Sequence, residues 1–459
     1  MMIISKGFFV SATVAVLIFS ATGVSYQQML FAGEEEDGAC VDYQPIENTI
    51  TIVCDASFEN VADTVDDQDI LEELGDGEYL LKANLRVNNG VTFAMTSDDG
   101  LQYLKIAGAN GIIVKGKIQI NGVKITSWDA SANDVVQQNI TGSIGRAYIQ
   151  FGASEGSEIL NSEFAYLGYQ ELGRRGFDLF GDGGVSHDME IRGSKFHHMW
   201  RGFYSTGAYN ITIDGNEYHH NINYGVDPHS GTHDMNITNN WLHHNPIGVI
   251  CSNDCYNIMI EGNKIHHNTK AGIFFSRNVQ DSIARNNHIY NASTGIIVSE
   301  SSDNRIYNNT IEATTSEGVL LFNPAEPDEG LTENNLVYYN TISDSTDGIN
   351  ASRSHDNILG DNKFSNMRSS EYHLSRNSSI KIIEQDFDNA SITTGKGLPT
   401  GNIVEIVYSG TIEVIDVNDR EEDDNNAQAV NEGKYYYHNT DSKPYRKILS
   451  DGGSIIVNS

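Results

Sequence analysis

A glycine followed by an apolar residue recurs along the middle of the chain at nearly constant intervals. Seven such pairs are separated by steps of 23, 23, 24, 23, 23 and 30 residues, and their glycines are Gly202, Gly225, Gly248, Gly272, Gly295, Gly318 and Gly348. The longer last step contains the segment 323–330, whose prolines and acidic residues indicate a loop insertion. A period of this size is typical of a repeat protein, in which each unit buries its apolar face only on its neighbours.

Within each repeat the apolar runs are short and rich in β-branched residues, which favours strands over helices. Asparagine forms a second register, at Asn216, Asn240, Asn263, Asn287, Asn309, Asn340 and Asn362. Asparagines at one corner of successive coils stack roughly 4.8 Å apart, so each amide can bond the next. We therefore predict an all-β fold: a single-stranded right-handed parallel β-helix with β-rich caps at both ends.

The repeat and the composition divide the chain into four parts. In residues 1–25, Lys6 precedes an uncharged, mostly apolar run from Gly7 to Val24. This pattern is typical of a cleaved export signal. The run is also just long enough for an uncleaved membrane anchor, with a buried helix as a further alternative. The other parts are a β-rich N-terminal cap (38–105), the β-helix (106–380) and a β-rich, acidic C-terminal tail (381–459).

The charge balance excludes one large class of functions. Asp and Glu number 62 against 29 Lys and Arg, giving a formal net charge of -33. A protein that binds nucleic acid needs a basic footprint, so no nucleic-acid partner is expected. We expect a monomer outside the cytoplasm, either periplasmic, secreted or anchored at the cell surface through its N-terminal segment.

The four cysteines form two local pairs, Cys40 with Cys54 and Cys251 with Cys255. An even number of cysteines in an exported chain is compatible with two disulfides. Neither pair has the spacing of a CxxC zinc motif. The sequence leaves each pair open between a disulfide and two free buried thiols.

One coil departs from the repeat with the run Tyr224-Gly225-Val226-Asp227-Pro228-His229. A proline inside a ladder strand loses a hydrogen bond, and Tyr, Asp and His can donate and accept protons. Arg201 precedes its glycine just as Tyr224 does, so the two should lie about one strand spacing apart. A cation there could neutralise a substrate carboxylate. The structural alternative is a set of ordinary surface residues with a bulge at Pro228.

This hexad resembles the signature of mannuronan C5-epimerases, which are parallel β-helix enzymes that act on alginate-type polyuronates. His233 matches a downstream histidine of the same segment. The resemblance also extends to the neighbouring coils, at 201–204 and 248–252, and covers roughly residues 78–365. There are two departures: Ser230 stands where many relatives have an acidic residue, and Asn253 stands where many have Arg or Lys.

The resemblance implies a set of site residues. His229 and Tyr224 would be the proton-transfer pair, Asp227 would orient or polarise the site, and Arg201 would neutralise the uronate carboxylate. The expected substrate-binding residues are Tyr204, His233, Asn253 and Arg277, of which Arg277 could partly replace the charge missing at Asn253. Arg174, Arg175, Arg192 and Lys195 are further candidates for a local positive surface.

The implied activity is inversion at C5, which converts D-mannuronate to L-guluronate within a polyuronate chain. Removing the C5 proton makes a dianionic enolate, which needs a nearby cation or proton donor. If O4 leaves from that intermediate, the result is a uronan lyase; a non-catalytic glycan-binding or structural β-helix is the alternative of another class. No cofactor is required, and Ca²⁺ is an optional bridge between two anions.

Adjacent histidines recur at 197/198, 219/220, 243/244 and 266/267. They occupy matching positions in successive coils and therefore form a ladder. We interpret them as a stacked structural corner and predict no metal site, because the same corner continues as Tyr290-Asn291. Zinc or copper binding is the alternative.

Overall fold

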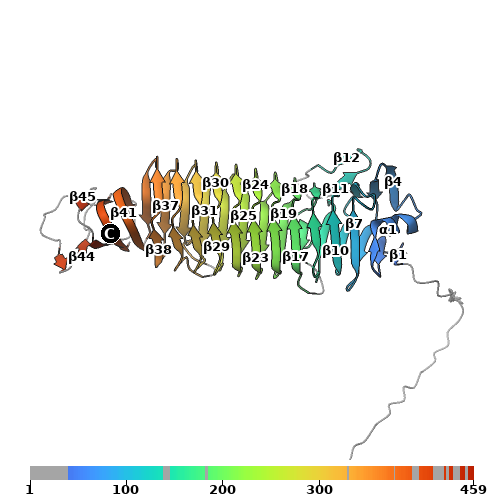
Figure 1. Cartoon of the computed structure of the whole chain (residues 1–459), viewed down its shortest axis with the longest axis horizontal. Coiled ribbons are helices and arrows are strands. Elements are labelled where there is room, and N and C mark those ends of the chain that lie inside the picture. Colours follow the sequence, from blue (N-terminus) through green and yellow to red (C-terminus); the bar gives the residue numbers. More distant parts are fainter. Residues whose placement is uncertain are drawn as a thin grey trace, which may run out of the picture. The chain divides into compact units, whose positions relative to one another are not determined.

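The computed structural model describes the backbone of residues 40–137, 145–180, 184–327, 330–376, 378–394, 403–416, 428–430, 434–437, 445–449 and 453–458, and side-chain packing up to Ile383. These residues form strands almost throughout, with a single short helix, α1 (Phe58–Thr64), among them. Equivalent strands of successive coils pair in parallel, and the coils follow one another along the long axis (Figure 1). The predicted all-β parallel β-helix is therefore confirmed.

Each central coil consists of three strands, such as β19 (Arg201–Thr206), β20 (Tyr209–Asp214) and β21 (Glu217–His219). Each strand pairs in parallel with its equivalent one coil later, which gives the stack three faces. The first face contains β16 (Gly176–Leu179), β19, β22 (Tyr224–His229), β25 (Ile247–Ser252), β28 (Ala271–Ser276), β31 (Thr294–Ser299), β34 (Glu317–Phe322), β37 (Asp347–Ser352) and β40 (Ser370–Ser375).

The other two faces follow the same order. The second face contains β17 (His187–Arg192), β20, β23 (His233–Thr238), β26 (Tyr256–Glu261), β29 (Ile283–Arg285), β32 (Arg305–Tyr307), β35 (Leu336–Tyr338) and β38 (Asn357–Gly360). The third contains β15 (Glu163–Ala165), β18 (Lys195–His197), β21, β24 (Trp241–His243), β27 (Lys264–His266), β30 (His288–Tyr290), β33 (Thr310–Glu312), β36 (Thr341–Ser343) and β39 (Lys363–Ser365).

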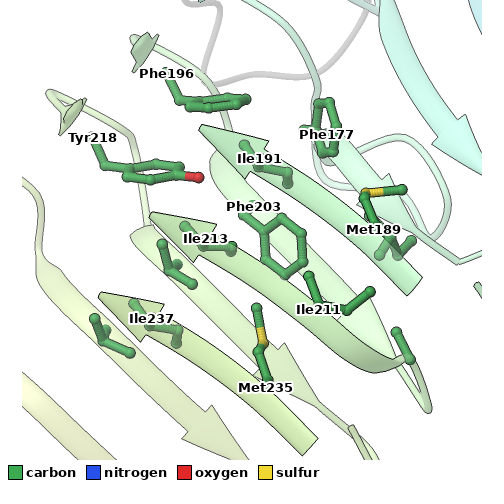
Figure 2. Close-up of a cluster of buried hydrophobic side chains, with 14 of the residues drawn as sticks. Phe177, Met189, Ile191, Phe196, Phe203, Ile211, Ile213, Tyr218, Met235 and Ile237 are labelled. Carbon is green, nitrogen blue, oxygen red and sulfur yellow. The ribbon is translucent and has the colours of Figure 1, made fainter. Parts of the chain in front are cut away.

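The core runs between the three faces, and each face contributes one or two apolar side chains per coil. Phe203 of the first face, Ile213 of the second and Tyr218 of the third are all fully buried in it (Figure 2). Aromatic rings also stack along the axis, with Phe196 and Tyr218 4.7 Å apart between ring centroids. Because each coil covers the next, burial of these side chains stabilises the stack as a whole.

The glycine repeat has a steric cause. A Cβ atom on Gly225 would lie 2.6 Å from the carbonyl oxygen of Gly248 in the next coil, and one on Gly202 would lie 2.4 Å from that of Gly225. Such distances are far inside van der Waals contact, so the close approach of the backbone excludes any side chain at this position.

The asparagine register forms the predicted ladder. The side-chain amide of Asn216 donates to the side-chain oxygen of Asn240 at 3.1 Å, and Asn240 donates to Asn263 at 3.0 Å. The ladder continues in this way as far as Asn362. A second ladder, which the sequence analysis did not identify, includes Asn221 and Asn245. These bonds satisfy amides that are buried from water.

At the N-terminal end, β1 (Val41–Gln44) pairs antiparallel with β2 (Thr49–Ile52), and Cys40 and Cys54 form a disulfide. Parallel stacking begins as early as the pairing of β2 with β6 (Asn84–Val87), upstream of residue 106, where we expected the β-helix to begin. Cys251 and Cys255, in contrast, are free and buried. One of the two open cysteine pairs is thus a disulfide and the other a pair of thiols.

At the C-terminal end, β41 (Ser379–Thr394) pairs in parallel with β42 (Ile403–Asp416), which in turn pairs antiparallel with β46 (Gly453–Asn458). The predicted export segment at 1–25 lies outside the described residues. Within the part of the chain that is described, no helix is both long and apolar enough to span a membrane.

Candidate active site

The strand β22 carries the hexad, and only its end residues, Tyr224 and His229, are partly accessible to solvent. Val226 is fully buried in the core between the faces. The pleat therefore places Asp227 on the opposite, outer side, with His229 two residues further on the same side. Tyr224 also lies outside the core, where its ring packs against Ile247 and Ile250 of the next coil.

The strand β19 pairs in parallel with β22 and places residues of the preceding coil beside the hexad. Tyr204 pairs with Asp227 and Thr206 with His229. The guanidinium of Arg201 lies 5.1 Å from the ring centroid of Tyr224, and its Nη1 donates to Asp227 Oδ2 at 2.5 Å. Arg201 is therefore beside Tyr224, as the shared distance from the two glycines predicted, and its charge is engaged by Asp227.

Asp227 is buried although it lies on the outer side of the strand: its side chain is only 1% exposed. Arg201 and Tyr204, from the preceding coil, take up the space around it. Burial raises the pKa of Asp227 to about 7, although the neighbouring Arg201 and Arg175 lower it. Asp227 is therefore suited to hold Arg201 in place rather than to contact a substrate directly.

One acidic residue of this site was missed from the sequence. Asp178 of β16 pairs in register with Tyr204, so that Asp178, Tyr204 and Asp227 form one column across three coils. Burial also raises the pKa of Asp178 to about 7. The signal was present: Arg175-Gly176-Phe177-Asp178 repeats the Arg-Gly-Phe pattern of 201–203, but at a step of 26 residues rather than 23.

Arg175 is the second cation of the site. Its guanidinium lies 4.2 Å from the ring centroid of Tyr204, and Arg201 lies 4.8 Å from the same ring. Asp178 Oδ2 accepts a hydrogen bond from the backbone N–H of Arg175. No carboxylate forms a salt bridge with the Arg175 guanidinium among the described residues, so it can neutralise an incoming anion.

Buried polar atoms without hydrogen-bond partners gather at this site. The described residues contain 11 buried side chains with such an atom, and five of them surround the hexad: Arg175, Asp178, Arg201, Asp227 and Asn253. An unpartnered buried polar atom is destabilising, and native structures keep few of them without a reason. Their concentration here indicates a site that water or a polar ligand completes.

His229 stands at the end of β22, with its ring centroid 5.5 Å from that of Tyr204. Its Nδ1 lies 2.6 Å from the hydroxyl of Ser230, the residue that replaces the acidic neighbour of many relatives. Partial burial, and then the charges of Arg201, Arg277 and Arg175, lower the pKa of His229 to about 4. The imidazole is therefore neutral near pH 7 and can accept a proton.

Arg277 reaches back along the axis toward Asn253. Both residues have a left-handed backbone at the corner that follows the first face, one coil apart. Arg277 Nη2 donates to the hydroxyl of Ser252, which pairs in register with His229. The guanidinium thus lies in the coil where many relatives carry a cation.

Several predicted residues lie away from this cluster. His233 belongs to the second face, where its ring stacks between Tyr209 and Tyr256 at 5.3 and 4.5 Å. Arg192 is also on that face and pairs with Asp214. Lys195 lies on the third face, 3.3 Å from Glu217. The structure therefore brings together Arg201, Tyr204, Tyr224, Asp227 and His229, with Arg277 adjacent, but not His233.

Fold and site together define a right-handed parallel β-helix protein. One outer face carries a cluster of cationic and polar side chains, some of whose buried polar atoms have no hydrogen-bond partner among the described residues. A family model described as "Right handed beta helix region" matches residues 202–335. The mannuronan C5-epimerase of Pseudomonas aeruginosa is 26% identical over 183 residues, which are 38% of this chain and 33% of that protein. The mannuronan C5-epimerase of Pseudomonas putida is 26% identical over 328 residues, which are 68% of this chain and 52% of that protein.

Solved structures show the same fold. The crystal structure of the periplasmic alginate epimerase AlgG matches with a TM-score of 0.60 and 21% identity, over 78% of this chain and 84% of that one. The A-module of the mannuronan C-5 epimerase AlgE6 of Azotobacter vinelandii matches with a TM-score of 0.53 and 18% identity. The match covers 68% of this chain and 90% of that one. These comparisons confirm the resemblance to mannuronan C5-epimerases. The chain spans about a third to a half of the length of the curated relatives.

Proposed function

We propose that this protein is an extracytoplasmic C5-epimerase that inverts uronate residues within a polysaccharide chain, with mannuronate-to-guluronate conversion as the expected reaction. The observation that carries the proposal is the outer cluster around the hexad. Among the described residues, it combines an Arg175 guanidinium that forms no salt bridge, buried polar atoms without partners, and a neutral histidine and a tyrosine at the two ends of one strand.

The spacing of Tyr224 and His229 suits a reaction on two faces of a sugar. Five residues along a strand correspond to roughly 16 Å between Cα atoms at about 3.3 Å per residue. A pyranose ring can therefore lie between the two side chains, above Tyr204. The Tyr224 hydroxyl makes no hydrogen bond within the described residues, whereas Tyr204 accepts one from Thr206 at 3.0 Å and is nearly fully buried.

In this arrangement neutral His229 takes the C5 proton, and the electron pair of the C–H bond delocalises into the carboxylate as an enolate. Tyr224 then returns a proton to the other face of C5, which inverts that carbon. Arg175 and Arg201 offset the charge that develops on the carboxylate oxygens. The bound uronate is itself an anion, so it raises the pKa of His229 from its low value and makes the imidazole a stronger base.

Two alternatives share this site. If the bond from C4 to O4 breaks from the enolate, the chain is cleaved and an unsaturated end forms, as in a lyase. A glycan-binding β-helix would hold the uronate with the same arginines and do no chemistry. No cofactor is required by the proposed steps, and a bridging Ca²⁺ remains optional.

Proton NMR in heavy water separates the three functions. The protein is incubated with polymannuronate and a panel of other uronans, and deuterium at C5 and chain length are both measured. An epimerase introduces deuterium at C5 while chain length stays constant. Shortening with a new ultraviolet-absorbing end would show a lyase, and binding without deuterium in any uronan would refute the catalytic proposal.

A further inference from the structure

The paired histidines form a ladder at the corner that follows the third face. Each pair has one histidine at the end of a strand and one in the corner itself, and the corner histidines His198, His220, His244 and His267 all have a left-handed backbone. Other coils form the same corner with asparagine or aspartate, as at Asn291, Asp344 and Asn366. Those residues adopt this conformation readily, so the turn does not itself require histidine.

Within each pair the two Nδ1 atoms face each other. Their distance is 2.8 Å for His197/His198, His243/His244 and His266/His267, and 2.9 Å for His219/His220. Corner rings of successive coils stack in parallel, with His220 and His244 4.8 Å apart between centroids. The ladder therefore concentrates nitrogen atoms along one edge.

Two of the four histidine pairs, or rungs, have a carboxylate at Nε2 of the strand histidine: His197 with Glu163 at 3.3 Å, and His243 with Glu217. Of these two, the His243 rung also has a third histidine nearby, His220. His243 Nε2 lies 3.1 Å from Oε1 of Glu217, whose other oxygen is bound to Lys195. A carboxylate accepts hydrogen bonds only, so Nε2 of the neutral ring carries the proton and Nδ1 presents a lone pair. A histidine that donates its second N–H to a carboxylate in this way is the usual arrangement of a metal ligand.

The next rung has the opposite arrangement. The indole N–H of Trp241 donates to Nε2 of His266 at 2.6 Å. This bond requires a lone pair on Nε2, so in the neutral ring the proton of His266 lies on Nδ1, inside the pair. His266 is therefore unsuited to ligate through Nδ1, which makes the His243 rung distinct from its neighbour.

The geometry selects a class of ion. Nδ1 or Nε2 atoms of His220, His243 and His244 lie within 4.8 Å of one another. Two nitrogens about 2.0 Å from one ion are about 2.8 Å apart at an angle near 90° and about 3.3 Å apart at the tetrahedral angle. The 2.8 Å between the Nδ1 atoms of His243 and His244 fits the tetragonal geometry of Cu²⁺ better than the tetrahedral geometry of Zn²⁺.

We propose that His243, His244 and His220 form a site for a tetragonal divalent ion, Cu²⁺ in particular, with Glu217 orienting His243. His220 and His244 are exposed, so their rings can turn toward the ion and their displaced protons can move to Nε2 at the surface. The histidine corner leads into the first face, so it precedes Arg201 and Tyr224 by three to four residues, whereas His229 lies at the far end of β22. The proposed metal site is independent of the proposed epimerase activity.

Copper titration of the full chain tests this site. Calorimetry with CuSO4 alone should show one tight site per chain, and electron paramagnetic resonance should show a tetragonal Cu²⁺ signal coupled to nitrogen. Fluorescence of Trp241, whose ring lies 4.4 Å from that of His243, should be quenched at the same stoichiometry. Zn²⁺ should bind more weakly, because the affinity order and the geometry both favour copper.

Variants locate the ion. The double variant His220→Asn/His244→Asn keeps residues that suit the left-handed corner, so its melting temperature should be unchanged. It should bind Cu²⁺ at least about 100-fold more weakly than the wild type. Glu217→Gln should weaken Cu²⁺ binding about 10- to 100-fold. His288→Asn, which removes an exposed histidine outside the ladder, is the matched control and should bind like the wild type. If the double variant unfolds, His244→Asn alone is compared.

Three results would overturn the proposal. They are the absence of a stoichiometric copper site, full copper affinity in the histidine variants, or tighter binding of Zn²⁺ than of Cu²⁺. The second would place the ion elsewhere, for example at the exposed group of Glu155, His187 and Asp188 on the second-face side.

Discussion

Arg201 and Asp227 come from neighbouring coils and meet at 2.5 Å, with the carboxylate 1% and the guanidinium side chain 17% exposed. This ion pair occupies the centre of the candidate active site, between Tyr204 and Tyr224. Because the pair is buried, removing one partner leaves a charge without compensation, which is far more destabilising than losing a surface salt bridge. Arg201 therefore has a structural role as well as any role in binding.

Replacing Arg201 by methionine should lower the free energy of unfolding by about 3 kcal/mol or more at pH 8. The loss should shrink toward pH 5. Without Arg201 the folded-state pKa of Asp227 rises further above its unfolded value, so the folded state binds more protons and gains stability as the pH falls. Chemical denaturation at both pH values measures this. The double variant Arg201→Met/Asp227→Leu is the control and should recover most of the stability; equal losses in both variants would contradict the paired arrangement.

Turnover should depend on Arg175 more than on Arg277. Arg175→Met removes a guanidinium whose Nη1 has no hydrogen-bond partner among the described residues, and should reduce kcat/KM by about a hundredfold, the effect of losing one charge-stabilising group. Arg277→Met should have a smaller effect, because its guanidinium is bound to Ser252. Arg192→Met, on the second face, is the control and should leave kcat/KM unchanged. Equal small effects at Arg175 and Arg277 would show that the carboxylate binds elsewhere.

The pH profile should reflect the low pKa of His229. The neutral ring is the required form, so kcat/KM should fall on acidification through about pH 4 rather than through 6.5. Arg277→Gln removes a positive charge that lowers this pKa, and should move the acidic limb upward. Titration of the His229 ring proton by NMR checks the same shift without activity. An unshifted limb would mean that Arg277 does not act on His229.

Substitutions of His229, Tyr224 and Tyr204 should differ in their effects on activity. His229→Ala should abolish deuterium incorporation at C5 while leaving melting unchanged, because an outer side chain contributes little to the core. Tyr224→Phe keeps the ring and loses only the hydroxyl, and should be severely impaired. Tyr204→Phe should retain much more activity, since that hydroxyl is nearly buried and bound to Thr206. The reverse order would assign the proton donor to Tyr204.

The repeat predicted the fold and the register of the candidate site, whereas the roles of the site residues came from the resemblance of the hexad. A step of 23 residues fixes which positions stack, and therefore the glycine column, the asparagine ladder and the placement of Arg201 beside Tyr224. These features depend only on register along the axis. A constant period determines that register, because the strands pair one coil apart throughout.

Other features depend on how side chains of different length fill the space around each position, and the period contains no information on that. Only the tertiary structure showed that Asp227 is buried against Arg201 and that Asp178 joins the column despite its irregular step. It also showed that Arg175 has a buried guanidinium nitrogen without a hydrogen-bond partner among the described residues. The same holds for the histidine ladder. The sequence determined which rings stack, whereas contacts across coils with Glu217 and Trp241 decided which nitrogen of each ring carries the proton.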